Sequence, residues 1–552
     1  MASVSELSDR FVDGYSACDP TLAALIFGVG RSGSTLTDYS PDGVAAVTDV
    51  LRRALRDLEE ASVGSEAERL GAAWMKDWVG GRLGLFASGE RERLVSPLIG
   101  APALTRSVFD LMPQDGDEHW ERIADRLEAV PSVMDGYAES LRGGLTQGHP
   151  SSRRLVGAVA EQCHTWAGDG SGGWFSGFVG EYGDGALADR LRSAGSDADR
   201  AYGQLGSWLT TDYAPAATDV DGVGEDRYRV WMADSLGTDD LDLDETYAWG
   251  WEEWVRLEDE KVRECDRIIS GAQFDEVQQL LNQDPAYSID GVDAYRDWLQ
   301  GVVDEAIDAL NGSEFEIPEP LLRCEVAIPP EGSGAAPYYS GPAEDMSTSG
   351  RVCFPTMGAT RFPRWRDVTT AYHEAVPGHH LQVGLTMTMP LTRLHRLGFN
   401  SAHGEGWALY AERLMDELGW FDSPDTRLGF LSAQAFRAAR VVVDIGLHTG
   451  RRIPEGCKNA GEVWTYDLAV EHMMRASGEG RASTESEVLR YLSMPSQATT
   501  YKLGERAWLD ARQLATVSAQ GEFDRTTWHA QALSLGPMGL NRFAKELTAD
   551  AA

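Results

Sequence analysis

The sequence predicts a mainly α-helical protein with a small β-sheet, and three observations support this fold class. Apolar residues recur at three- and four-residue spacing in several long segments. Only two short segments, residues 322–328 and 350–356, have the apolar pattern of a strand. The 552 residues are 42% hydrophobic and 25% charged, which is typical of a globular protein with one large core or several domains.

The helical assignments depend on apolar residues that return to one face of a helix. Residues 43–60 carry such a stripe, which consists of Val47, Leu51, Leu55 and Leu58. Residues 291–310 carry a longer one, and Asp290 stands before it, where an N-cap is expected. Residues 431–448 and 485–515 also have helical patterns. We expect these stripes to form the core.

A stretch rich in Pro, Asp and Gly, residues 211–224, is the best candidate for a domain boundary. It predicts an N-terminal helical half, residues 1–215, and a second helical half, residues 225–552. The second half contains both predicted strands and all the residues to which we assign chemistry below.

The two predicted strands, residues 322–328 and 350–356, precede a histidine-rich motif. We expect them to pair as a small antiparallel sheet near that motif. The Gly-, Tyr- and Ser-rich stretch between them, which includes Tyr338 and Tyr339, would then lie over the motif. An edge strand there could hold an extended substrate through main-chain hydrogen bonds, so Tyr339 is a candidate substrate-binding residue.

Composition argues against several function classes. The formal net charge of −38 repels phosphate, so we expect no nucleic-acid partner. No apolar run approaches the ~18 residues that span a membrane, and the N-terminal residues lack the features of a secretory signal. The six cysteines include no C-x-x-C pair, as expected for reduced thiols. We therefore expect a cytoplasmic protein without a membrane partner; the oligomeric state is left open.

The stretch HEAVPGHH, which begins at His373, contains a modified metal-binding motif. In the standard form, H-E-x-x-H, two histidines one helical turn apart bind Zn²⁺ and the glutamate is a general base. Here Pro377 occupies the position of the second histidine. If Pro377 and Gly378 are left out, the motif is restored, with Glu374 as the base and His379 as the second ligand.

Two conformations of this stretch would present different ligands. A bulge at Pro377 and Gly378 returns His379 to the face of His373, because Pro removes a helical hydrogen bond and Gly tolerates unusual backbone. A helix that ran on would instead present His380, two turns after His373. We expect the bulge, because Pro costs ~3 kcal/mol inside a helix. His380 is then a candidate for the wall of the substrate site.

Glu405, in the stretch GEGWALYAE, is the candidate for the third ligand. A zinc hydrolase needs three protein ligands and an open position for water. The separation from His379 leaves room for a loop and a second helix, so two helices can converge on one ion. Alone, Glu405 would be interpreted as a solvated charge at a helix start. Seven of the eleven histidines fall between His373 and His472, and this clustering favours a metal site over isolated surface or core histidines.

Two glycine-rich stretches match the G-x-G-x-x-G pattern of a phosphate-binding loop. Residues 28–35 (GVGRSGST) lack the lysine of a triphosphate loop, and no helical pattern follows them. Residues 168–173 (GDGSGG) follow a helical pattern instead of a strand. We interpret both as ordinary loops.

Four blocks of the sequence resemble, in order, the motifs of a large bacterial family that is catalogued as domain-of-unknown-function family 885. They are HEAVPGHHLQ (373–382), GEGWALYAE (404–412), RAARVVVDIGLH (437–448) and PSQATTYKLGERAWLDAR (495–512). The resemblance runs over nearly the whole chain. It implies a large helical fold similar to the Taq-type thermostable metallocarboxypeptidases and the relatives of angiotensin-converting enzyme. Those have a deep cleft between two helical halves, with a gluzincin site of two His and one Glu on its floor. The Taq-type enzymes have an uninterrupted H-E-x-x-H, unlike this chain.

The same resemblance suggests roles for three further residues. In helical gluzincins a tyrosine from a C-terminal helix hydrogen-bonds the oxyanion, and Tyr501 is the tyrosine of the matching block. It could equally be a core or cleft-wall residue. Arg437 and Arg440, three residues apart on a predicted helix, could bind the carboxylate of a substrate C-terminus or pair with acidic side chains.

The leading expectation is a zinc-dependent peptidase, carboxypeptidase-like, that hydrolyses peptides. Zinc held by His373, His379 and Glu405 would lower the pKa of a bound water towards ~7. Glu374 would take its proton, and the ion and Tyr501 would stabilise the oxyanion. The alternatives are a metal-dependent amidohydrolase acting on a small non-peptide amide, and a metal-free, catalytically inactive helical binding protein. The intact base Glu374 argues against the last of these.

Overall fold

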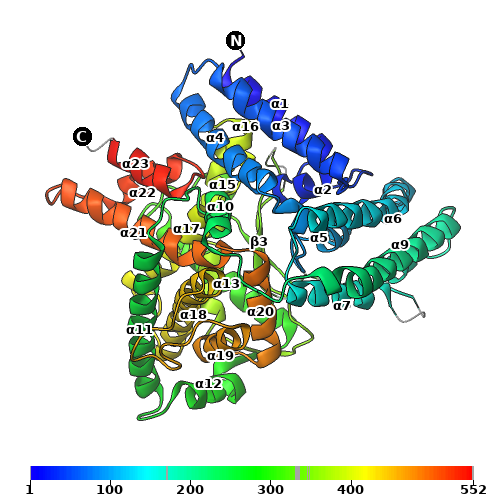
Figure 1. Ribbon diagram of the computed structural model, residues 1–552. Helices are drawn as coiled ribbons and strands as arrows, with labels where there is room; N and C mark the ends of the chain where they lie inside the picture. The colour runs from blue at the N-terminus through cyan, green and yellow to red at the C-terminus, as the bar shows by residue number, and fades with distance from the viewer. Residues whose placement is uncertain (1, 169–171, 330–335, 345, 347, 550–552) are drawn as a thin grey trace. The chain divides into compact units, whose positions relative to one another are not determined.

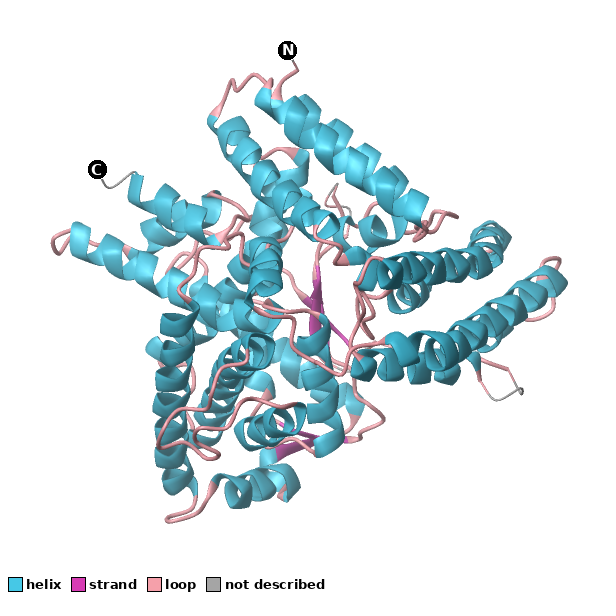
Figure 2. Ribbon diagram, viewed as in Figure 1, coloured by secondary structure: helices cyan, strands magenta, loops and turns pink. Residues whose placement is uncertain are grey.

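The computed structural model describes residues 2–168, 172–329, 336–344, 346 and 348–549. It confirms the predicted mainly helical fold, in which the few strands are three residues long (Figures 1 and 2). The chain divides into two compact units. The first extends to Asp234 and also includes Thr392–Gly398 and Ser486–Pro495; the second contains the rest of the chain.

The first unit is helical throughout. Apart from short 3₁₀ and π turns, its helices are α1 (Val4–Cys18), α2 (Pro20–Leu22), α3 (Pro41–Glu59), α4 (Glu66–Ala87), α5 (Ala101–Ser107), α6 (Asp117–Thr146), α7 (Arg153–Ala167), α8 (Trp174–Val179), α9 (Ala188–Trp208), α10 (Glu225–Ser235) and α16 (Arg393–Leu397). Helix α9 packs against α6, α7 and α8 (Figure 1). Their shared core includes Trp120, Leu127, Val156 and Tyr202.

The second unit contains the strands and the predicted site. Its helices are α11 (Leu243–Ile268), α12 (Phe274–Gln283), α13 (Val292–Leu310), α14 (Asp367–Glu374), α15 (His379–Thr388), α17 (Ser401–Glu417), α18 (Pro424–Thr449), α19 (Tyr466–Ser477), α21 (Thr500–Ser518), α22 (Arg525–Ser534) and α23 (Leu540–Ala549). Helix α20 (Arg481–Ser493) contributes residues to both units. The long helix α18 packs along α11, and α17 packs along α21 (Figure 1).

The predicted helix at residues 43–60 is α3, and its start follows from the sequence. Ser40 is the N-cap, and its Oγ accepts a hydrogen bond from the Gly43 N–H at 3.2 Å. Val47 and Leu51, from the predicted stripe, are buried. The predicted linker, residues 211–224, ends directly before α10, and the residues of α10 up to Asp234 belong to the first unit.

One detail of the predicted helices is wrong. Asp290 does not cap α13: the N-cap is Gly291, and the Asp290 carboxylate accepts a hydrogen bond from Arg361 at 2.7 Å. The segment 485–515 is mostly helical, but it is divided between two helices, because α20 ends before Pro495 and α21 begins at Thr500. Pro lacks an N–H for the helix, and Ser496 has a φ of 70° with its N–H bonded to Asp444 Oδ2 at 2.9 Å.

The expected antiparallel pairing of residues 322–328 with 350–356 is also wrong. Strand β2 (Glu325–Ala327) runs parallel to β4 (Arg351–Cys353), and β3 (Tyr338–Ser340) completes the sheet antiparallel to β4. The long connection between β2 and β4 permits this pairing, because parallel neighbours need a crossover of a dozen residues or more. β4 is the central strand, so the two edges of this sheet are β2 and β3. A second, antiparallel pair is formed by β1 (Ser288–Asp290) and β5 (Arg361–Pro363).

Candidate metal centre

His373, His379 and Glu405 lie together in the second unit. Their ligand atoms are all within 4.8 Å of one another, and no other such cluster of His, Cys, Asp or Glu occurs in the described part of the chain. Oε2 of Glu405 is 3.4 Å from Nε2 of His373 and 3.6 Å from Nε2 of His379. The two imidazole rings are almost perpendicular, with their centroids 4.9 Å apart. Three donor atoms therefore point at one small volume.

The helix is interrupted between the two histidines. His373 lies near the end of α14, and His379 is the first residue of α15. The backbone leaves the helical region at Ala375, with ψ of −115°, and again at Gly378, with ψ of −131°. A Cβ on Gly378 would lie 1.8 Å from the carbonyl oxygen of His373, so no other residue fits without a rearrangement. This break turns the His379 side chain towards His373.

Helix α17 holds this break and supplies Glu405. The Nε1–H of Trp407, two residues after Glu405, donates to the carbonyl oxygens of Pro377 at 2.8 Å and Gly378 at 3.2 Å. Trp407 is fully buried. At the start of α17, the side chain of Asn400 accepts a hydrogen bond from the His403 N–H at 2.9 Å and caps the helix. The position of α17 therefore determines both the third donor and the backbone between the first two.

Glu412, two helical turns after Glu405 on α17, orients His373. Its Oε1 accepts a hydrogen bond from Nδ1 of His373 at 2.7 Å, and its Oε2 accepts one from the Thr369 hydroxyl at 2.7 Å. Glu412 is fully buried. Histidines that bind metals commonly donate their other ring N–H to a carboxylate in this way. Glu412 was not among the residues predicted from the sequence. Its seven-residue spacing from Glu405 could have indicated it, because residues two turns apart share a helix face.

The carboxylates of Glu405 and Glu412 stabilise positive charge at the two histidines of the cluster. Burial lowers the pKa of His373, but its contacts with Glu405 and Glu412 outweigh burial and raise the pKa to about 9. Burial opposes the charged form of Glu405, but His373 and His379 outweigh it and hold the pKa of Glu405 well below its usual range. Burial raises the pKa of Glu374, although both histidines oppose the rise.

His380 lies apart from this cluster, in contact with Tyr339. The Tyr339 hydroxyl is 3.1 Å from Nδ1 of His380, whose Nε2–H donates to the Leu321 carbonyl at 3.0 Å. Both ring nitrogens are therefore occupied, and burial lowers the pKa of His380. The stretch that we expected to lie over the site includes residues 330–335, 345 and 347, which are outside the described residues. Tyr339, within that stretch, contacts His380 and not the three donors.

Tyr501 lies beside the two predicted arginines. The guanidinium carbons of Arg437 and Arg440 on α18 are 5.9 Å and 4.9 Å from the centre of the Tyr501 ring. Arg437 also reaches Glu412, with 3.9 Å between Nη2 and Oε1. Contacts thus lead from Tyr501 through Arg437 and Glu412 to His373.

Two glycines allow this proximity of α21 to α17. A Cβ on Gly406 would lie 2.4 Å from Cα of Gly504, and a Cβ on Gly504 would lie 2.0 Å from the Ala402 carbonyl oxygen. Only glycine at both positions lets the two backbones approach this closely. Tyr501 is therefore on a helix that is packed directly against the helix that carries Glu405.

The first glycine-rich stretch, residues 28–35, is a loop, as predicted, and its carbonyl groups are bound by an arginine side chain. The guanidinium of the buried Arg126 donates hydrogen bonds to the carbonyl oxygens of Gly30, Arg31 and Thr35, at 3.1 to 3.2 Å. A loop that gathers its carbonyls around an arginine is unlike a phosphate loop, which presents its N–H groups. In the second stretch, residues 169–171 are outside the described residues.

Within the described residues, no helix has the length and hydropathy to cross a membrane. Over its whole length the chain is similar to a crystal structure of the "putative lipoprotein" of Colwellia psychrerythraea, with a TM-score of 0.83, 20% identity and 100% of both chains covered. It is also similar to a "putative lipoprotein of unknown function" of Shewanella oneidensis, with a TM-score of 0.74, 17% identity, and 99% of this chain and 100% of the other covered. At these identities the similarity shows the fold alone.

A comparison with proteins of curated function found no match. The model of one family, described as "Bacterial protein of unknown function (DUF885)", matches residues 22–547. This match spans both compact units, including every residue of the candidate metal centre. The chain therefore belongs to the DUF885 family.

Proposed function

We propose that this protein is a zinc-dependent peptidase that acts on peptide ends, in the manner of a carboxypeptidase. The observation that carries the proposal is the convergence of His373, His379 and Glu405. Donors bound to one tetrahedral zinc at about 2.1 Å are about 3.4 Å apart. The distances from Glu405 Oε2 to the two histidine nitrogens, 3.4 and 3.6 Å, agree with this value.

The charges of the surrounding residues also favour a dication. Glu374, Glu405 and Glu412 are three acids at the cluster, and Arg437 is the cation that interacts with Glu374 and Glu412. If the acids are ionised and the histidines neutral, the sum is −2, which one Zn²⁺ neutralises. Two imidazoles with one carboxylate are a usual ligand set for zinc, whereas Mg²⁺ and Ca²⁺ prefer oxygen ligands alone.

A simpler interpretation is a metal-free ion-pair cluster in which His373 is protonated. The raised pKa of His373 is compatible with it. It gives no reason for Glu374, a third buried acid, to stand beside the pair. Measuring the metal content distinguishes the two interpretations.

Zinc bound at this cluster would polarise a substrate carbonyl and lower the pKa of water. The residues of the chain would then handle the protons. Glu374 follows His373 directly, and burial raises its pKa towards the range in which a carboxylate can act as a general base near neutral pH. It would accept the proton of the attacking water on a carboxylate oxygen and deliver it to the leaving amine. Glu412 would keep the proton of His373 on Nδ1, so that Nε2 offers its lone pair.

Arg437, Arg440 and Tyr501 support the preference for peptide ends. Nε of Arg437 is buried and has no hydrogen-bond partner in the described structure. Arg440 is buried between the rings of Phe436 and Tyr501, at 4.4 and 4.9 Å. Guanidinium groups bind carboxylates bidentately, so this pair suits a substrate C-terminus. We propose that the Tyr501 hydroxyl stabilises the oxyanion that forms at the scissile carbonyl.

The test combines metal content with peptide hydrolysis on the full chain. The purified protein should hold close to one zinc per chain, and His373→Ala and His379→Ala should both lose it. His380→Ala is the matched control, because it removes a neighbouring buried histidine outside the cluster. Glu374→Gln should keep the zinc and lose about 10²–10⁴-fold in activity. A peptide with a free C-terminus should be cleaved in preference to its amidated form, and Arg440→Gln should reduce that preference.

Each component can fail separately. If wild-type protein holds no zinc and gains none on incubation, the metal proposal is wrong and a binding protein is the better interpretation. If zinc is present but only small non-peptide amides are cleaved, the protein is an amidohydrolase. If the zinc is lost from His380→Ala and kept in His379→Ala, the ligand assignment is wrong.

A further inference from the structure

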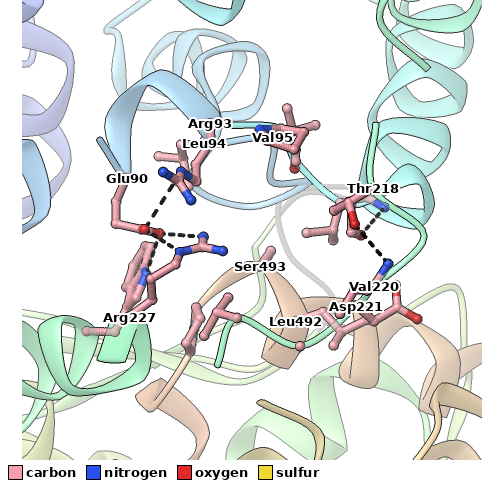
Figure 3. A pocket seen from close by; sticks show the side chains of 18 residues that line it. Glu90, Arg93, Leu94, Val95, Thr218, Val220, Asp221, Arg227, Leu492 and Ser493 are labelled. Atoms are coloured by element: carbon pink, nitrogen blue, oxygen red, sulfur yellow. Dashed lines mark hydrogen bonds and ion pairs between the residues drawn. The ribbon is translucent and has the colours of Figure 1, made fainter. Parts of the chain in front are cut away.

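The first unit contains a cavity of about 240 Å³ that the proposed peptidase chemistry does not use. Its walls come from three parts of the chain, around Glu90–Val95, Pro150–Leu155 and Thr218–Trp231, together with the end of α20. Figure 3 shows Arg93 and Arg227 around Glu90 on one side, with Thr218, Val220 and Asp221 opposite. None of the residues of the candidate metal centre lines it.

Glu90 already has all the partners that it needs. It is almost fully buried, and Nε and Nη2 of Arg227 donate to its two oxygens at 2.6 and 2.9 Å. The Trp231 Nε1–H donates to the same carboxylate at 2.8 Å. Glu90 and Arg227 are therefore a paired, bidentate unit with little net charge to offer a ligand.

Arg93 is different, because neither of the carboxylates near it, Glu90 and Glu92, hydrogen-bonds it in the described structure. Its Nε donates to the Gly89 carbonyl at 3.1 Å and lies 3.8 Å from the nearest oxygen of Glu90. Its two terminal amino groups have no hydrogen-bond partner among the residues that the structure describes. Its side chain is 12% exposed. Burial, and after it the charge of Arg227, lower the pKa of Arg93, while Glu90 and Glu92 oppose this change.

The opposite wall of the cavity adds a paired acid and the start of a helix. Asp221, on that wall, is paired with Arg154 at 2.9 Å. Helix α7 starts there, and its N-cap Ser152 lines the cavity, so the positive end of the helix dipole faces it. Apolar side chains, those of Leu94, Val95, Leu155 and Leu492, also line the cavity. The cavity thus combines a guanidinium whose terminal amino groups have no hydrogen-bond partner in the described structure with apolar side chains.

We propose that this cavity binds a small organic carboxylate, with its carboxylate on the terminal amino groups of Arg93 and its apolar part against the aliphatic wall. A guanidinium with two free amino groups matches the two oxygens of a carboxylate. The single charge of one guanidinium suits a monoanion better than a phosphate dianion. The proposal is independent of the metal centre, because it involves no residue of the second unit.

The test is calorimetric titration of the full-length protein, at low ionic strength, with butyrate as the probe. Inorganic phosphate and butylammonium serve as comparison ligands. Butyrate should bind at millimolar concentration or below, and more tightly than phosphate, and butylammonium should not bind. Arg93→Gln should weaken butyrate binding by about tenfold or more, because it removes the charged fork. Arg52→Gln, at an exposed arginine of α3, is the matched control and should bind as the wild type does.

A second variant keeps the proposal testable if Arg93→Gln does not fold. Val220 lines the cavity and is 66% exposed, so Val220→Trp should occupy the cavity entrance at little cost in stability and abolish binding. Three results would each overturn the proposal: no butyrate binding by the wild type, unchanged binding by a folded Arg93→Gln or by Val220→Trp, or tighter binding of phosphate than of butyrate.

Discussion

Replacing Glu412 with Gln tests whether the proposed metal centre depends on a residue outside the three proposed ligands. Gln has the size of Glu, so the buried site stays filled. The Gln Oε1 can still accept the hydrogen bond from Nδ1 of His373, now without the negative charge. The other oxygen, which accepts the Thr369 hydroxyl at 2.7 Å, becomes an amino group, and Thr369 must turn to accept from it. Arg437 also loses its acidic neighbour at 3.9 Å.

The expected size of the effect follows from these contacts. A hydrogen bond to a charged group contributes about 1.5–3 kcal/mol, and a neutral one about 0.5–1.5 kcal/mol. Losing the charge on the His373 contact therefore costs about 1–1.5 kcal/mol, which is close to a tenfold change in an equilibrium constant. Removing groups that orient metal ligands typically weakens metal binding about 10–100-fold. We expect zinc affinity to fall about tenfold, near the lower end of that range, because Gln preserves the geometry.

The assay is a competition titration of zinc between the full-length protein and a chelating dye. Glu417→Gln is the matched control: it lies on the same helix, pairs with Arg512 at 2.7 Å and is partly exposed. It should bind zinc as the wild type does. Glu405→Gln should lose far more affinity than Glu412→Gln, because it removes a ligand atom. If Glu412→Gln binds zinc within about twofold of the wild type while Glu405→Gln does not bind, the reasoning about His373 and Glu412 is refuted.

Three further predictions follow from the same geometry. Gly378→Ala should lower the free energy of unfolding in urea by about 3 kcal/mol or more, because its Cβ would overlap the His373 carbonyl. Gly301→Ala in α13, where a Cβ meets nothing within 4 Å, should not destabilise the protein. Equal stability of the two variants would contradict this explanation of the helix break. A chelator should lower the midpoint of thermal unfolding. Zinc at about 100 times its Kd should then raise the free energy of unfolding by about 2.7 kcal/mol in the wild type and leave it unchanged in His373→Ala. A midpoint that does not change with chelator would count against a bound metal. Burial raises the pKa of Asp367 to about 6, against the opposing hydrogen bond from Tyr295, so the folded state holds this proton more tightly than the unfolded state. The contribution of Asp367 to stability should therefore fall as the pH rises from about 4 to 6. Asp367→Asn should remove that fall from the urea midpoints, and a pH profile parallel to that of the wild type would show that another group causes it.

The sequence contained enough information to predict the helical fold class and the three donors. Periodic apolar stripes predicted α3 and α13 because burial of one face is a local property of the sequence. The three donors could be proposed because the order of H-E-x-x-H is restored once Pro377 and Gly378 are left out, and because zinc needs a third ligand, for which Glu405 was available. The Pro-Gly pair made a helix break the expected conformation, and Gly378 shows the physical reason: it lies against the His373 carbonyl, where a side chain does not fit.

The features that the sequence did not predict depend on contacts between distant segments. The parallel pairing of β2 with β4 is set by how the chain between them returns, which no pattern within either strand specifies. Asp290 has the residue type of an N-cap, but its carboxylate is bound by Arg361 from another strand. That Glu90 makes no hydrogen bond to Arg93 is visible only once Arg227 is known to bind the Glu90 carboxylate. In each case a partner far along the chain determines the role of a residue.

Helix α17 supplies three contacts on which the proposed metal centre depends. Glu405 offers a donor, Trp407 binds the carbonyls of the break, and Glu412 orients His373, all from one helix. In an uninterrupted H-E-x-x-H helix, the two histidines are fixed by that helix itself. Here the break separates α14 from α15, so their relative position depends on contacts from outside, and α17 provides them. The Pro-Gly insertion breaks the helix, and the buried Trp407 holds the backbone at that break. A displacement of α17 would change the third donor, the position of His379 and the orientation of His373 together.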